Sequence, residues 1–163
     1  MIRDDEFARL VKYAEGMGLK VRFKPYVPYS RVMADWTTDG TELTVYVTCR
    51  ESKLDLVLSL IHEIGHHRGF IENGRKPDTK IEAAMDDEEK KKNRKIIYEN
   101  EVHDTKYWEQ IYHDTDCRFG LDLLNKQKEF DTWVYEVYYE TGKIPTAKER
   151  VKKRRALKQK YGR

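Results

Sequence analysis

The chain is poor in cysteine and has no long apolar run, and each shortage excludes a class of protein. Its 163 residues include 2 cysteines, Cys49 and Cys117, which are too far apart in sequence for a disulfide framework or a closely spaced zinc-binding pair. No apolar stretch approaches the roughly 20 residues that cross a bilayer. The first ten residues are acidic and lack the apolar core of an export signal. We therefore expect a cytoplasmic protein with no membrane association.

Charge is plentiful and unevenly distributed. Charged residues make up 37% of the chain, and an aromatic content of 12% still allows a packed core. Residues 148–163 contain nine Lys or Arg and one Glu, a net charge of +8, whereas residues 1–147 carry 23 Lys or Arg and 28 Asp or Glu, a net charge of −5. We predict one domain over residues 1–147 and a basic tail over 148–163, frayed or disordered and too polar to contribute to a core. Such a tail is a candidate site for nucleic acid, although most basic tails are simply solvated.

Hydrophobic spacing predicts an α+β fold in which a helix and a small sheet come first. The turn signal Asp39-Gly40 lies between two extended segments, so we expect a mostly antiparallel sheet. The predicted elements of this part are a helix over 4–15 and strands over 19–24, 32–36 and 41–48.

The rest of the chain is predicted to be helical. Ser52 can cap a helix whose surface is apolar nearly all round, which is typical of a helix at the centre of a domain. A turn-rich loop, 73–78, ends it. Further helices are expected over 79–113 and 121–140.

The central helix contains the sequence His62-Glu63-Ile64-Gly65-His66, an HExxH motif. Residues i and i+4 lie on one face of a helix, so both imidazoles can reach one metal ion. Glu63 projects beside that ion, where it can take a proton from a water molecule that the metal activates. Zinc suits two imidazoles, one further ligand and one open position, and a chain of this composition would contain the motif by chance only about 0.015 times. The alternative is a pair of ordinary core histidines.

With this motif the chain resembles the zincin metallopeptidases, in the order helix, small sheet, HExxH helix and ligand-bearing helix over residues 1–113. The resemblance implies that the strand before the HExxH helix, residues 43–48, borders the cleft and pairs with an extended peptide substrate.

The third ligand has several candidates, of which we favour Glu101. The segment from Glu101 to Tyr112 is similar to the ligand helix of ImmA/IrrE-like metallopeptidases, with Asp104 and Thr105 where that family has Ala-Asn. On a regular helix Glu101 would share a face with Trp108 and Tyr112, and a carboxylate there needs a cation.

Three other residues compete for this role. His103 begins a His-x-x-x-Tyr-Trp segment that looks like the motif of SprT-like zinc proteins, and it lies about 200° around a regular helix from Glu101. Glu72 has the spacing of the third metzincin ligand, but that group has His or Asp there. Glu99 is a weaker candidate.

The sequence therefore predicts a zinc-dependent metallopeptidase that hydrolyses a peptide bond in a protein or peptide substrate, with His62, His66 and Glu101 on the metal and Glu63 as general base. The ImmA/IrrE resemblance implies a regulatory target such as a repressor. Rival interpretations are an SprT-like protease acting on a DNA-associated target, another metal-assisted hydrolase, and a zinc-binding interaction module without activity. An intact Glu63 argues against the last.

Overall fold

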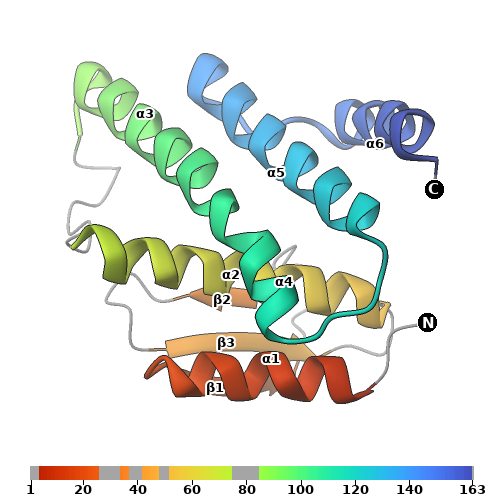
Figure 1. The fold of residues 1–163 in the computed structure, drawn as a ribbon. Helices are drawn as coiled ribbons and strands as arrows, with labels where there is room; N and C mark the ends of the chain where they lie inside the picture. Colours follow the sequence, from red (N-terminus) through yellow and green to blue (C-terminus); the bar gives the residue numbers. More distant parts are fainter. Residues whose placement is uncertain (1–3, 26–33, 37–41, 48–51, 75–84, 163) are drawn as a thin grey trace. The chain divides into compact units, whose positions relative to one another are not determined.

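The structure is a computed structural model that describes residues 4–25, 34–36, 42–47, 52–74 and 85–162. The chain divides into two compact units (Figure 1). Unit 1 comprises Met1–Asp78 and Lys106–Phe119, and unit 2 comprises Thr79–Thr105 and Gly120–Arg163. This division does not follow the predicted boundary at residue 147. None of the described helices is long and apolar enough to cross a membrane.

The described part of unit 1 contains a small sheet and three α-helices. Helix α1, Asp4–Gly16, packs on strand β1 and on α2, and α2 packs on strand β2 and on α4. The core of this unit consists of fully buried aliphatic side chains from the predicted apolar faces, namely Leu10, Ala14, Leu43, Val45, Val57, Leu60, Ile61 and Ile64. The elements are α1, β1 (Lys20–Pro25), β2 (Ala34–Trp36), β3 (Glu42–Val47), α2 (Lys53–Asn73) and α4 (Trp108–Asp114).

The sheet is mixed, with strand order β1-β3-β2, so the prediction of a mostly antiparallel sheet is wrong. Strand β3 pairs antiparallel with β2 from Leu43 to Val45, but it pairs parallel with β1 over its whole length. The reversal between β2 and β3 was predicted correctly from the Asp39-Gly40 signal, although that turn lies outside the described residues. Strand β1 runs in the direction of β3 and opposite to β2, and it lies on the edge of β3 that β2 does not occupy.

The HExxH helix forms as predicted. The side chain of Ser52 accepts a hydrogen bond from the backbone N–H of Asp55, at 3.2 Å, and caps the first turn. The helix ends where Gly74 adopts a left-handed conformation, with φ +55°, that a residue with a Cβ rarely takes. Between these caps lie the buried residues of α2, which are Val57, Leu58, Leu60, Ile61, Ile64, Gly65, His67 and Gly69.

Unit 2 is helical in its described part. Helix α5, Leu121–Thr141, packs on α3, Asp87–Asp104, and on α6, Ala147–Tyr161. Helix α3 begins with a capping box formed by Asp86 and Glu89. It ends at Asp104 rather than continuing to residue 113, because a single 3-10 turn, Thr105–Tyr107, precedes α4. Glu101 therefore lies in α3 of unit 2, whereas Trp108 and Tyr112, which were predicted to share its face, lie in α4 of unit 1.

The segment predicted to be a frayed or disordered tail is the helix α6. Thr146 and Glu149 form a capping box at its start, and Leu157 is 2% exposed. Glu129 of α5 accepts hydrogen bonds from Lys153, Lys160 and Tyr161. Lys160 and these other donors hold the pKa of the Glu129 carboxyl below its usual range. The expectation that this segment contributes nothing to a core is wrong, because a polar composition hid one apolar position that faces α5.

We expect Leu157→Ala to release α6 locally. Removing a buried Leu side chain costs about 2 kcal/mol or more, so the amides of α6 should exchange with solvent about 30-fold faster. Hydrogen exchange followed by mass spectrometry measures this directly. Val151→Ala on the same helix is the matched control, because Val151 is 49% exposed and should leave exchange unchanged. Equal protection of α6 in the wild type and in Leu157→Ala would contradict the docking of this helix.

Candidate metal centre

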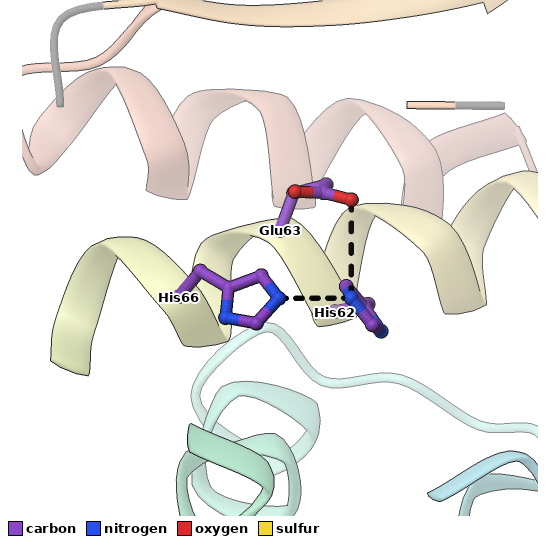
Figure 2. Close-up of side chains that lie close together, drawn as sticks. All are labelled: His62, Glu63 and His66. Atoms are coloured by element: carbon purple, nitrogen blue, oxygen red, sulfur yellow. Dashed lines mark hydrogen bonds and ion pairs between the residues drawn. The ribbon is translucent and has the colours of Figure 1, made fainter. Parts of the chain in front are cut away.

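One turn of α2 brings together the three residues of the HExxH motif. The Nε2 atoms of His62 and His66 lie 2.9 Å apart, and their rings meet edge to face at 4.6 Å between centroids. A carboxylate oxygen of Glu63 lies 4.0 Å from Nε2 of His62, and Figure 2 shows all three side chains turned toward one another. Among the described residues this is the group whose ligand atoms, all within 4.8 Å of one another, could hold a metal ion.

The helix itself explains this arrangement. His62 and His66 are one turn apart on the same face, while the neighbouring Val57, Ile61 and Ile64 anchor α2 in the core. All three polar side chains of the motif are half-buried, with 14% of the His62 side chain and 16% of the Glu63 side chain exposed. The group therefore lies at the edge of the core, where solvent can still reach it.

The donor set fits zinc. Two Zn–N bonds of about 2.05 Å at the tetrahedral angle place the two nitrogens about 3.3 Å apart, a few tenths of an ångström more than the 2.9 Å between the two Nε2 atoms. The 4.0 Å between Glu63 and His62 is too long for a direct hydrogen bond. The carboxylate thus lies beside the two imidazoles.

The indole of Trp108 supports this group from α4. Its ring centroid lies 5.3 Å from that of His62, tilted by 55°, and only 1% of Trp108 is exposed. Because both sides of this contact belong to unit 1, the orientation of the His62 ring depends on how α4 packs on α2. Sequence spacing placed Trp108 on the face of Glu101 and did not connect it with His62.

The adjacent His67 has a purely structural environment. It is 4% exposed, and its Nε2 lies 3.2 Å from the backbone oxygen of Met17 at the end of α1. Burial lowers the pKa of His67, because a charged imidazolium would lose its hydration. His67 therefore joins α2 to α1 and takes no part in the metal group.

Glu72 does not fit the metzincin placement. Helix α2 continues to Asn73, which puts Glu72 about 15 Å along the helix axis from His62. The hydroxyl of Tyr107 donates a hydrogen bond of 2.7 Å to Glu72, and Arg68 donates one of 3.3 Å. The Tyr107 hydroxyl, followed by Arg68, holds the pKa of Glu72 below its usual range.

The network around Glu72 was not predicted. Arg68 also donates to the hydroxyl of Tyr13 at 3.3 Å and lies 3.9 Å from the carboxylate of Asp114, so it joins α1, α2 and α4. Sequence spacing gave no signal for the contacts with Tyr13, Tyr107 and Asp114, because these partners are 35 to 55 residues away along the chain.

Glu101 and His103, the two leading candidates for the third ligand, both lie near the end of α3 in unit 2. Glu101 is 3% exposed, and Asp104, three residues on and on the same face, is 1% exposed. The His103 side chain is 35% exposed, and its Nδ1 lies 3.0 Å from the carboxylate of Asp104. Glu101 thus occupies the more buried position, whereas Glu99 is 59% exposed.

Cys117 is a free cysteine and is buried. Cys49 lies outside the described residues. Burial raises the pKa of the Cys117 thiol, which does not favour a thiolate ligand.

Comparison of the chain with known protein families, with curated proteins and with solved structures finds no match.

Proposed function

We propose that the protein is a zinc-dependent metallopeptidase that cleaves a peptide bond in a protein substrate. The observation that carries the proposal is the pair of Nε2 atoms 2.9 Å apart with the Glu63 carboxylate 4.0 Å from one of them. Two imidazoles without a neighbouring acid would suit a structural metal, but a carboxylate beside them suits hydrolysis. A binding module without activity has no use for Glu63.

His62 and His66 would hold the metal through Nε2. Zinc at this position would polarise a substrate carbonyl and make a water molecule nucleophilic near neutral pH. Glu63 accepts the proton that the water loses as its oxygen bonds to the carbonyl carbon. Glu63 then gives that proton to the nitrogen of the leaving amine as the C–N bond breaks. Trp108 keeps the His62 ring in place through these steps.

Glu101 is our proposal for the third ligand. A buried carboxylate is costly unless a cation or several hydrogen-bond donors stabilise its charge, and Glu101 is more deeply buried than His103. Its similarity to the ImmA/IrrE-like ligand position supports the same choice. His103 is the alternative ligand, because the Asp104 carboxylate 3.0 Å from its Nδ1 could orient the ring so that Nε2 binds the metal.

The substrate would bind as an extended strand. Strand β3 was expected to pair with it, but β3 is the central strand of the sheet, flanked by β1 and β2. Strand β2 is an edge strand of the described sheet and packs against the HExxH helix. We therefore assign β-augmentation by the peptide to the outer edge of β2, antiparallel or parallel to Ala34–Trp36. The cytoplasmic location and the regulatory nature of the substrate remain predictions from the sequence.

Zinc content tests the metal centre. We expect one zinc per wild-type chain and none in His62→Ala or His66→Ala, because each change leaves a single imidazole at the group. His113→Ala is the matched control, since the His113 side chain is 60% exposed on α4 and lies outside the group. Elemental analysis after dialysis gives the stoichiometry, and full occupancy in both mutants would overturn the proposal.

A second measurement, of zinc affinity, distinguishes the third ligand. In competition with a chelator at one pH, Glu101→Ala should weaken zinc binding about 10- to 100-fold or more, whereas His103→Ala should have a milder effect. The reverse result would replace Glu101 by His103 and favour the SprT-like interpretation.

A further inference from the structure

One face of helix α6, which we call its inner face, packs on α5. Leu157 is buried, and the guanidinium carbon of Arg154 lies 4.0 Å from the centroid of the Phe130 ring. Lys153 and Lys160 both reach the carboxylate of Glu129. The cations on this side of the helix are therefore compensated within unit 2.

The outer face of α6 is basic and lacks such compensation. Four exposed cations, Lys148, Lys152, Arg155 and Lys158, fall within about 120° of arc and about 15 Å of helix axis. No described residue forms an ion pair with any of them at 4.0 Å or less. The one acid of α6, Glu149, is held in the capping box by the N–H and hydroxyl of Thr146. We call these four residues the basic face.

The basic face suits a regular line of negative charges. A DNA duplex carries one phosphate about every 3.4 Å along each strand, so 15 Å of helix faces roughly four phosphates of one strand. A membrane surface fits less well, because a helix that binds a bilayer buries its own apolar face, and the apolar side of α6 is packed on α5. Binding to single strands normally uses stacking on aromatic rings. The aromatic residue of α6, Tyr161, instead donates a hydrogen bond to Glu129.

We propose that the basic face of α6 binds the phosphate backbone of duplex DNA without reading its sequence. Lysine recognises phosphate as a point charge on a flexible stem, so three lysines and one arginine provide affinity but little base selectivity. This activity goes beyond the proposed peptidase and does not depend on zinc. Its consequence would be to bring the protein close to substrates that are themselves bound to DNA.

The test compares two variants of the full chain with equal net charge. The first replaces Lys148, Lys152, Arg155 and Lys158 by Gln. The second replaces four exposed lysines elsewhere, Lys12, Lys20, Lys91 and Lys92, by Gln. Each change lowers the net charge from +3 to −1, so the variants differ only in where the charge is lost. Gln keeps the helix propensity of Lys, and circular dichroism verifies the fold.

Fluorescence anisotropy with two 20-base-pair duplexes of unrelated sequence gives the affinity as a function of salt. Four phosphate contacts predict about 150-fold weaker binding at 200 mM than at 50 mM salt, with both duplexes bound equally. The basic-face variant should bind at least tenfold more weakly at 50 mM salt and lose most of the salt dependence, while the control variant should bind like the wild type.

Three results would overturn the proposal. The first is the absence of wild-type binding at 50 mM salt. Both variants could lose affinity equally, which would indicate net charge rather than this face. Finally, anionic vesicles containing phosphatidylserine, or a single strand of the same length, could bind more tightly than the duplex and depend on the same four residues. Zinc removal with a chelator should leave duplex binding unchanged, which separates this test from that of the peptidase.

Discussion

Replacing Glu63 by Gln is expected to lower peptide hydrolysis at least about a hundredfold while one zinc stays bound. The amide preserves the size of the side chain beside His62 but cannot accept the proton that the attacking water must lose. The two imidazoles are untouched, so the metal should remain. Cleavage of an unfolded protein such as casein, or of a peptide selected from a library, provides the rate, and elemental analysis provides the zinc content.

Glu72→Gln is the matched control for this experiment. Glu72 lies on the same helix but about 15 Å along its axis from His62, where Tyr107 and Arg68 donate hydrogen bonds to it. Its replacement should leave the rate within about twofold of the wild type, because it is remote from the proton transfer. If Glu63→Gln keeps near wild-type activity, Glu63 is not the base. If both variants lose activity equally, the loss reflects the helix rather than the acid.

Trp108→Ala is expected to have the largest effect on stability. Trp108 is 1% exposed, and its removal would leave a cavity between α4 and α2 that costs about 3 to 5 kcal/mol. The His62 ring would lose the indole that lies 5.3 Å from it, so zinc affinity should fall as well. Chemical denaturation followed by circular dichroism measures the first effect, and chelator competition measures the second.

Two further variants make this prediction robust. Trp108→Phe keeps an aromatic ring at the position and should fold, with zinc affinity between those of the wild type and the alanine variant. Trp133→Ala in unit 2 removes the same side chain from a half-buried position beside Phe130, at 5.9 Å between ring centroids. It should cost less stability and leave zinc affinity unchanged. Wild-type zinc affinity in a folded Trp108→Ala protein would show that the indole does not position His62.

Local signals predicted the HExxH helix well. Its cap at Ser52, its buried faces and the convergence of His62, Glu63 and His66 all follow from spacings of three or four residues, which a helix converts directly into contacts. The same reasoning indicated Gly74 at the start of a turn. These features depend on residues that are close together in the sequence, so a local pattern is enough to predict them.

Features that depend on distant partners were predicted less well. The prediction of strand direction failed because β1 pairs with β3 and not with β2, its neighbour in sequence. No local pattern encodes that choice. The break after Asp104 also had no signal, since no Gly or Pro lies between residues 101 and 112. There the hydroxyl of Thr105 donates to the backbone oxygen of Val102 at 2.7 Å, a side-chain bond that competes with the helix.

The late position of α4 in the chain has a consequence for synthesis on the ribosome. Unit 1 needs residues 106–119, but unit 2 residues 79–105 are made first, so the HExxH helix emerges well before the tryptophan that supports His62. A nascent chain that stops at residue 78 carries both motif histidines yet has no α4 against which α2 can pack. The order of translation thus delays the packing of α4 around His62 until more than two thirds of the protein has been made.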